Sequence, residues 1–238
     1  MAFVLRCIEL VLNLVYREGG GTRVQTTSGR ALVVLGGDDT YEDLFTAGRV
    51  LPDLLAEVGL VARAALGTGA LAGAADADLV VLYTAAGRFD PDRQRRLADA
   101  VRDGTGLIAV HSATVLPDGA AGRIAYRLIG SRFAGHGPRP HTSRFTVWTS
   151  GTGTAAGIAP FEVEHEHYHL AMAGPATVDA WRDTHTGREP LVYRRTHGRG
   201  RVCYLQFGHD MRVWAEPSVR AIARNAARWA GRVPGSGG

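Results

Sequence analysis

The sequence predicts an α/β fold with a mostly parallel central sheet that is covered by helices on both faces. Short apolar runs at 31–37, 78–83 and 106–110 have the length and composition of buried parallel strands. Helical patterns alternate with these runs, as expected of a right-handed parallel sheet. With 238 residues, of which 45% are hydrophobic, the chain is long enough to bury the core of such a domain.

The organised domain is expected to begin at the apolar run 31–37, which ends in a pair of glycines. Apolar residues at helical spacing predict a helix from about 41 to 58, with Thr40 as its N-cap. A short strand is expected near 60–65. The glycine pair lacks the third glycine of a dinucleotide-binding fingerprint, so the sequence indicates a phosphate-binding loop only weakly.

The next unit places a histidine at the end of a strand. A strand at 78–83 is followed by a helix that starts at 90–92, with a proline in its first turn, and ends at 103–104. The apolar run 106–110 then leads directly to His111. Ligands of open α/β sheets bind beyond the carboxyl ends of the strands, so His111 is a candidate site residue. The alternative is a histidine that only caps its strand.

The C-terminal half of the chain has shorter elements. A short helix ends at Gly130 and leads to His136 in a glycine-flanked loop, where backbone can approach a ligand closely. The other expected elements are an exposed or edge strand at 145–148, a flexible loop at 149–157, strands at 191–194 and 201–207 joined by a hairpin turn at 197–200, and a helix at 217–229. His209 follows the last strand. No internal repeat and no second domain are expected.

The segment 161–170 is the densest cluster of polar side chains in the chain. In an extended conformation it would place His165, His167 and His169 on one face, opposite Glu164, Glu166 and Tyr168. The histidine face suits a metal or a solvated edge equally well. We expect the face that carries Glu166 to point inward.

Residues 1–30 are expected to form an N-terminal extension and linker, and 233–238 a flexible tail. The apolar run 1–16 is too short to span a membrane, and Glu9 interrupts what would be the core of a signal peptide. The two cysteines of the chain do not make a disulfide framework. These observations predict a cytoplasmic protein without a membrane partner.

The formal net charge is +4, from 27 basic and 23 acidic residues. Such an excess would suit a nucleic-acid-binding protein. The arginines are scattered, however, and mostly lie near acidic residues, which is typical of a solvated surface. No nucleic-acid partner is therefore expected.

A strand that turns sharply into a helix is also the layout of class I glutamine amidotransferases, whose flavodoxin-like sheet carries a nucleophilic cysteine at the turn. Here His111 holds that position, and neither Cys7 nor Cys203 follows the strand. Glutaminase chemistry needs a thiolate, so the sequence argues against it. Ser112 follows the histidine without the G-x-S-x-G pattern, which disfavours serine hydrolysis.

Three histidines share one kind of setting, since His111 and His209 directly follow strands and His136 lies between glycines. All three are expected at the carboxyl edge of one sheet. With Glu166 they form a set of three nitrogens and one oxygen that suits zinc or a similar divalent ion. Their spacing matches no compact metal motif. The alternative is a metal-free site in which these groups bind sugar hydroxyls and move protons.

Several segments together resemble the ThuA-like (trehalose utilisation) family, namely 106–113, 128–136 with its R-F-x-G-H, 165–168, and 198–210 with its G-R-V-x-Y-x-x-x-G-H-D. The resemblance covers roughly 31–232. It implies a flavodoxin-like three-layer sandwich, like that of class I glutamine amidotransferases but without their nucleophilic cysteine. It also implies a role in bacterial disaccharide use, with action on 3-keto sugars that partner oxidoreductases form.

The resemblance carries over to the family's polar positions at His111, His136, Glu166 and His209, with Asp210 beside the last. This chain departs from the family at two places. Members often carry a histidine after the first double glycine, where this chain has Asp-Asp-Thr-Tyr at 38–41. His165 also stands where an acid often precedes the glutamate. Both changes bear on which substrate and which metal are accepted.

These observations predict an enzyme, a hydrolase or lyase, that acts on a 3-keto glycoside or another disaccharide derivative. We assign catalysis to His111, Glu166 and His209, with Glu166 as the group that moves the proton. We assign a divalent metal, with zinc the first choice, to His111, His136, Glu166 and His209. No organic cofactor is expected. The residues expected to bind substrate are Asp38, Asp39, Tyr41, Ser112, Arg132, Tyr168 and Asp210.

The expected partner is a small-molecule sugar, and the prediction is compatible with a homo-oligomer. The competing hypothesis is a non-catalytic sugar-binding or regulatory module that uses the same pocket. Turnover of a sugar derivative, as opposed to binding alone, distinguishes the two.

Overall fold

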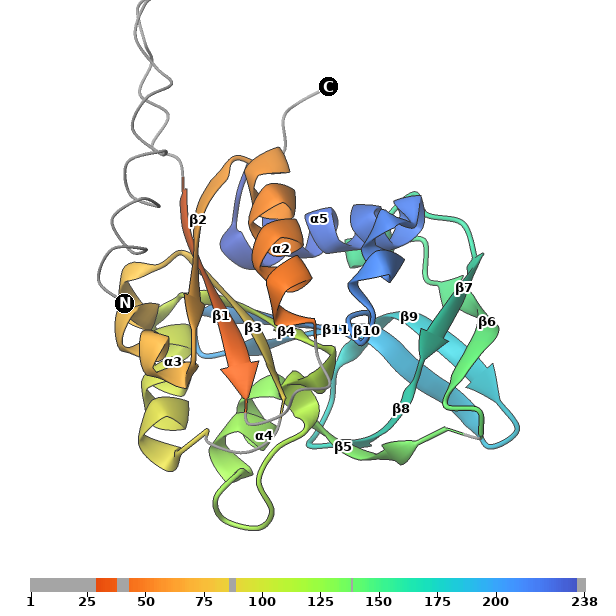
Figure 1. The fold of residues 1–238 in the computed structure, drawn as a ribbon, viewed down its shortest axis with the longest axis horizontal. Coiled ribbons are helices and arrows are strands. Elements are labelled where there is room, and N and C mark those ends of the chain that lie inside the picture. The colour runs from red at the N-terminus through yellow and green to blue at the C-terminus, as the bar shows by residue number, and fades with distance from the viewer. Residues whose placement is uncertain (1–28, 38–42, 86–88, 138, 235–238) are drawn as a thin grey trace, which may run out of the picture.

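The computed structural model describes residues 29–37, 43–85, 89–137 and 139–234, and a mixed sheet lies at its centre (Figure 1). Within these residues nine strands lie in the order β2-β1-β3-β4-β11-β10-β9-β6-β7. The parallel half contains β1 (Gly29–Gly37), β2 (Leu60–Leu66), β3 (Leu79–Ala85), β4 (Gly106–Val110) and β11 (Gly200–Leu205). The antiparallel half contains β10 (Gly187–His197), β9 (Thr177–Thr184), β6 (Thr142–Thr149) and β7 (Phe161–Glu166). A separate two-stranded ribbon pairs β5 (Ser131–His136) with β8 (Tyr168–Met172).

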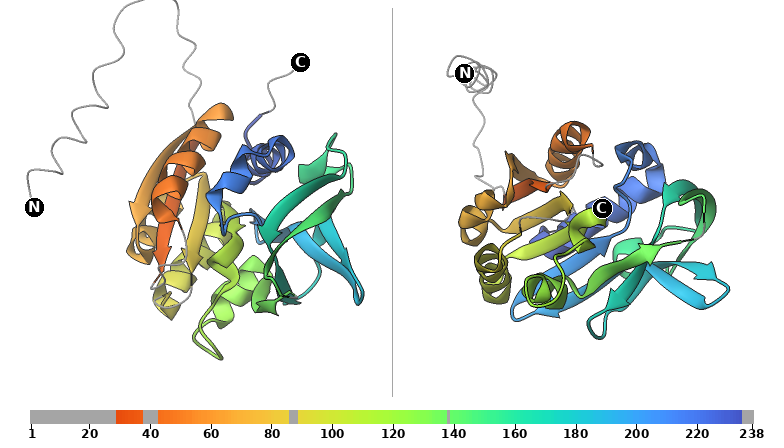
Figure 2. Two further views of the ribbon diagram at one scale, coloured as in Figure 1. Left: turned by 45° about the vertical axis from the view of Figure 1, so that its right-hand side comes forward. Right: turned by 60° about the horizontal axis from the view of Figure 1, so that its bottom comes forward.

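Helices cover both faces of the parallel half (Figure 2). One face packs against α2 (Leu44–Glu57) and α5 (Pro217–Gly231), and the other against α3 (Pro91–Asp103) and α4 (Arg123–Ile129). The described residues also form four 3-10 helices, η1 (Thr68–Asp76), η2 (His111–Thr114), η3 (Gly153–Ala155) and η4 (Met211–Ala215). The predicted α/β class and three-layer sandwich are confirmed. No helix of the described residues is long and apolar enough to cross a membrane.

β1 shows why the parallel strands are apolar throughout. Val33 packs into the core under α2 and α5, whereas Leu32 and Val34 pack into the core under α3 and α4. All three side chains are almost completely buried. Burial on both faces removes the polar alternation of a half-exposed strand, which is why these runs could be recognised from the sequence.

The first helix starts later than predicted. Asp43 is the N-cap of α2, because its Oδ1 accepts a hydrogen bond from the backbone N–H of Thr46 at 2.9 Å. Thr40, the predicted cap, lies outside the described residues, as do 1–28 and 235–238 of the predicted extension and tail.

The antiparallel half differs from the prediction. The strand at 145–148 is not an edge strand, because β6 lies between β9 and β7. The sequence does not indicate β9, because an acidic residue, Asp179, interrupts the apolar pattern that predicts a buried strand. In the structure Asp179 is buried and pairs with Arg194 of β10. The expected loop at 149–157 contains η3, whose Thr154 is buried and donates its hydroxyl hydrogen to Asp179. Polar contacts across the sheet thus replace the apolar pattern that predicts a buried strand.

Candidate functional site

His111 stands at the end of β4, at the first residue of η2, with a backbone φ of +43°. Residues other than glycine rarely adopt this conformation, which costs about 1–3 kcal/mol and persists only where the surrounding structure imposes it. The carbonyl oxygen of His111 accepts hydrogen bonds from Thr114 Oγ1 at 3.0 Å and from Tyr204 OH at 3.3 Å. These two contacts hold the turn in place, so the imidazole projects beyond the sheet edge as predicted.

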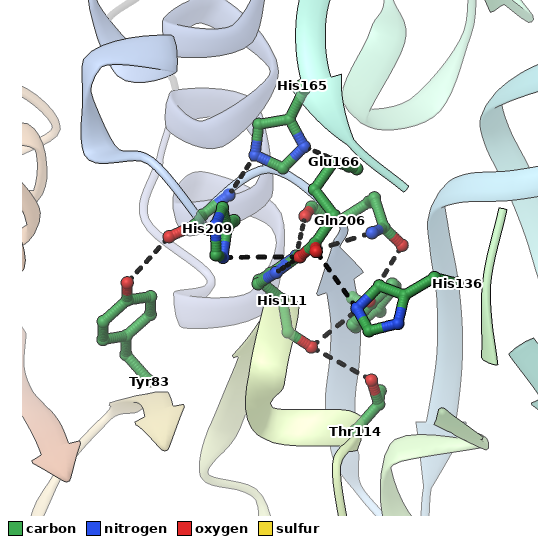
Figure 3. Close-up of polar contacts among 10 residues, drawn as sticks. Tyr83, His111, Thr114, His136, His165, Glu166, Gln206 and His209 are labelled. Atoms are coloured by element: carbon green, nitrogen blue, oxygen red, sulfur yellow. Dashed lines mark hydrogen bonds and ion pairs between the residues drawn. The ribbon is translucent and has the colours of Figure 1, made fainter. Parts of the chain in front are cut away.

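The hydrogen bonds of the buried His111 ring define its tautomer. Nδ1 lies 2.7 Å from the backbone carbonyl of Gln206, which can only accept, so Nδ1 carries the hydrogen. In the neutral ring Nε2 then presents its lone pair, and it faces Glu166 Oε2 at 3.2 Å (Figure 3). Tyr168 stacks on the ring with centroids 4.2 Å apart. The result is a nitrogen lone pair opposite a carboxylate oxygen in a buried place.

Glu166, the last residue of β7, brings together the histidines that the sequence singles out. Its carboxylate lies 3.2 Å from His111 Nε2, 3.0 Å from His136 Nε2 and 3.3 Å from His209 Nδ1. His136 belongs to the end of strand β5, not to a loop as predicted. Four separate segments therefore meet at one carboxylate. Glu166 points inward as predicted, whereas Glu164, on the same predicted face, is exposed.

The electrostatics of the cluster keep Glu166 ionised. Burial raises the pKa of Glu166, but a hydrogen bond from the protonated form of His111 and the charge of the neighbouring His209 outweigh burial and lower the pKa to about 2. Burial lowers the pKa of His136, and the opposing effect of Glu166 only partly compensates. At neutral pH the site thus holds a carboxylate that is a weak base beside a neutral imidazole at His136.

The predicted alternation along 161–170 is wrong. Side chains 165–168 are all buried in succession, because β7 ends at Glu166 and β8 then pairs with β5 instead of continuing the strand. His165 Nδ1 donates to the carbonyl oxygen of Glu166, and its Nε2 accepts the backbone N–H of Gly208 at 3.1 Å. His165 thereby joins the backbone of Glu166 to the residue before His209.

An open cavity of about 860 Å³ borders the cluster and is lined by Asp43, Thr142, Glu162, Val163, Glu164, His165, Glu166, His209, Asp210, Arg212, Val213 and Glu216. Its charged side chains are mostly carboxylates. Of the residues predicted to bind substrate, Asp210 lines this cavity, with its carboxylate against Arg212. Tyr168 lies on His111.

The other residues predicted to bind substrate lie elsewhere or outside the described part of the chain. Ser112 is buried directly beside His111, and its hydroxyl has no hydrogen-bond partner among the described residues. Arg132 pairs with Asp118 at 2.6 Å and is not part of the cavity lining, so the structure gives it a different partner. The segment 38–41, with Asp38, Asp39 and Tyr41, is not described.

Sequence reasoning missed the residues that support the cluster. Gln206 is fully buried, and its backbone carbonyl accepts the hydrogen bond from His111 Nδ1 at 2.7 Å. Tyr204 OH also lies 3.1 Å from Gln206 Oε1, so its single hydrogen is shared between this oxygen and the carbonyl oxygen of His111. The presence of a glutamine and a tyrosine in the otherwise apolar run 202–207 could have indicated that this strand makes buried polar contacts. Cys203, in the same strand, is fully buried, and burial raises the pKa of its thiol, so it offers no nucleophile.

The burial of His165 predicts that the free energy of unfolding depends on pH. Burial lowers the pKa of His165 from 6.5 to about 3, so the unfolded chain binds a proton between these values that the folded chain does not. Stability is then expected to fall by about 2 kcal/mol as the pH drops from 6.5 to 5. Urea unfolding of His165→Asn should show a smaller fall over the same range. An identical pH slope in the variant and the parent would contradict this role.

The comparisons with known proteins identify the family and agree with the fold. The model of the ThuA family, described as trehalose utilisation, matches residues 30–230. A ThuA-like protein from Bacteroides uniformis superposes with a TM-score of 0.70 at 13% identity, over 90% of this chain and 95% of that one. A ThuA-like protein from Parabacteroides merdae gives a TM-score of 0.68 at 13% identity, over 85% and 90%.

A β-galactosidase from Halorubrum lacusprofundi gives a TM-score of 0.62 at 16% identity, over 85% of this chain but only 30% of that one, so the likeness concerns part of that enzyme. At such identities these structures show the fold alone. No curated protein matches the sequence. Because the family model spans most of the chain and the fold agrees, the chain belongs to the ThuA family of trehalose utilisation.

Proposed function

We propose that this protein is an enzyme that acts on a 3-keto glycoside or a related disaccharide derivative, with a divalent metal ion held by His111, Glu166 and His209. One observation carries the proposal: His111 Nε2, which holds a lone pair in the neutral ring, faces Glu166 Oε2 at 3.2 Å in a buried place. Two acceptors at this distance repel each other unless a cation, a proton or a metal ion, lies between or beside them.

The donor atoms fit a metal ion. One ligand atom each from His111, Glu166 and His209 lies within 4.8 Å of the others. Two imidazoles and a carboxylate are a common protein ligand set for catalytic zinc, in which a further position stays open. The backbone carbonyl of Gln206 that accepts from His111 Nδ1 is the kind of outer partner that orients a ligating histidine.

His136 is the group that we propose moves protons. Its Nε2 lies 3.0 Å from Glu166 Oε1, so the neutral ring donates there and carries its lone pair on Nδ1. Its side chain is 37% exposed, whereas that of His111 is fully buried. The lowered pKa of His136 keeps the ring unprotonated at neutral pH, which suits a general base better than the weakly basic Glu166.

The reaction uses the acidity that a ketone confers on its neighbour. A C3 carbonyl acidifies the C2–H bond, and His136 takes this proton as the electron pair forms a C1–C2 double bond and the C1–O glycosidic bond breaks. The leaving oxygen then receives the proton from His136, and water adds across the double bond to give the free 3-keto sugar. A bound divalent ion would supply polarisation of the C3 carbonyl.

The cavity supports a sugar-sized, hydroxyl-rich ligand. Its volume of about 860 Å³ falls in the range typical of small-molecule sites, roughly 300–1,000 Å³. Its carboxylates can accept hydrogen bonds from hydroxyl groups but repel anions. The family's description as trehalose utilisation agrees with such a ligand.

Metal analysis of the purified protein tests the ion. The parent is expected to retain one divalent ion in this cluster, and His111→Ala and His209→Ala are expected to lose it, because each removes a ligand. The measurement is elemental analysis after dialysis against a metal-free buffer. Undiminished stoichiometric metal in both variants would remove these residues from the site.

Turnover of 3-keto glycosides with zinc, with manganese and without metal tests the reaction. We expect release of the leaving sugar only with metal, and loss of this activity in His136→Gln. Tight binding of disaccharides or their keto forms without turnover under any of these conditions would instead favour a non-catalytic sugar-binding module.

A further inference from the structure

We propose a second divalent-metal site, formed by His167, His169 and Glu189, that joins the β5–β8 ribbon to the main sheet. His167 is the single residue between β7 and β8, His169 lies on β8, and Glu189 lies on β10. One ligand atom from each lies within 4.8 Å of the others. None of the three belongs to the cluster around Glu166.

Two atoms of this second cluster have no partner in a buried place. The side chain of His167 is 1% exposed and that of Glu189 16% exposed. His167 Nε2 and Glu189 Oε2 each lack a hydrogen-bond partner among the described residues, and they face each other at 3.9 Å. That separation is too long for a hydrogen bond, and buried polar groups without partners are costly. Small rotations would bring both atoms onto one ion, since ligands about 2.1 Å from a zinc ion lie within roughly 4.2 Å of each other.

The remaining ligand completes a set that zinc favours. His169 Nδ1 contacts Glu189 Oε1, and the rings of His169 and His167 lie 5.7 Å apart at 78°. Two imidazoles and one carboxylate leave a fourth position for water, which the 42% exposed side chain of His169 indicates can be reached from solvent.

Arg182 of β9 opposes the ion and thereby sets its affinity. Its guanidinium contacts His167 Nδ1, which must then accept, so Nε2 carries the hydrogen. An ion on Nε2 requires this proton to move to Nδ1, and Arg182 must release the ring. The arginine lies over Phe145 at 4.7 Å and is partly exposed, so it would turn toward solvent to release the ring. The ion would take over from Arg182 as the positive charge facing Glu189.

An ion at this second site would also restrict the positions of residues in the cluster around Glu166. Gly137, the residue after His136, donates its N–H to the carbonyl oxygen of His167 at 3.2 Å, and a Cβ on it would overlap the His167 ring. His167 also directly follows Glu166. An ion bound to His167, His169 and Glu189 would therefore reduce the motion of the strand ends that carry His136 and Glu166.

Zinc titration of chelator-stripped protein tests the proposal, with competition against a chromophoric chelator as the readout. His209→Gln, which removes a ligand of the first cluster, serves as the background, so the second site is counted alone. We expect the His209→Gln variant to bind one equivalent of zinc and its thermal unfolding midpoint to rise when zinc is added. Adding His169→Gln or Glu189→Gln should weaken binding at least about 100-fold, because loss of outer partners alone costs roughly 10- to 100-fold.

Two further variants sharpen the test. His185→Gln, which removes an exposed histidine of the β9–β10 turn, should leave zinc binding unchanged. Arg182→Gln should tighten it about tenfold, since a positive charge beside the ion is lost. Equal zinc affinity with and without His169 and Glu189, or no zinc bound in the His209→Gln background, would overturn the second site. Neither outcome bears on turnover at the first cluster.

Discussion

Replacing Glu166 by glutamine is expected to abolish metal retention in the first cluster and to lower kcat/KM by roughly 10³-fold or more. The amide has nearly the same shape but carries no charge and offers only one acceptor oxygen. Its NH₂ group would face one of the imidazoles that now lie 3.0 to 3.3 Å from the carboxylate. The measurements are metal content and turnover of a 3-keto glycoside.

Glu164→Gln is the matched control for this variant. Glu164 lies two residues earlier on β7 and lines the same cavity, but it is exposed, and its nearest cation is Arg144 at 3.9 Å. We expect its metal content to equal that of the parent, with turnover within a few-fold, because exposed ion pairs contribute little, about 0–1 kcal/mol. Equal losses in the two variants would show that the charge of the cavity, not the contacts of Glu166, governs the site.

The second large effect is expected on stability, from Asp179→Ala. Asp179 is fully buried and accepts from Arg194 Nε at 2.5 Å and Nη2 at 3.0 Å, and from the N–H and hydroxyl of Thr154 at 3.0 and 2.6 Å. Removing the carboxylate leaves a partly buried guanidinium and a buried N–H without partners. Breaking such a pair costs about 3–5 kcal/mol, which urea unfolding measures.

Asp183→Ala, on the same strand, is the control for Asp179→Ala. Its side chain is 55% exposed and lies 3.7 Å from Arg188 Nε, so the expected change is about 0.5 kcal/mol. The double variant Asp179→Ala/Arg194→Met should recover part of the loss, because no unpaired charge remains. A single Asp179→Ala variant as stable as Asp183→Ala would refute the idea that this pair holds β9 in the sheet.

The parallel half of the fold could be predicted because its strands and helices are encoded by patterns of neighbouring residues in the sequence. β1, β3 and β4 are buried on both faces, so each is an unbroken apolar run, and the helices between them have apolar residues at helical spacing. The antiparallel half could not be predicted equally well. β9 is stabilised by a buried ion pair with a residue 15 positions away, and such a contact leaves no periodic trace.

The sequence indicated which residues form the candidate site, but not which of their atoms are in contact. The sequence alone determined that His111, Glu166, His136 and His209 are candidates and that a ThuA-like α/β sandwich would gather strand ends at one edge. Only the tertiary structure decided which atoms meet: His111 Nδ1 bonds to the carbonyl of Gln206, so its lone pair turns to Glu166.

The run of histidines after β7 shows the reason most directly. By sequence His165, His167 and His169 are equivalent, yet the first bonds to Gly208, the second contacts Arg182, and the third contacts Glu189. Those partners lie 15 to 43 residues further along the chain. Periodicity specifies the face on which a side chain starts, whereas its hydrogen bonds depend on groups that only folding brings within about 3 Å.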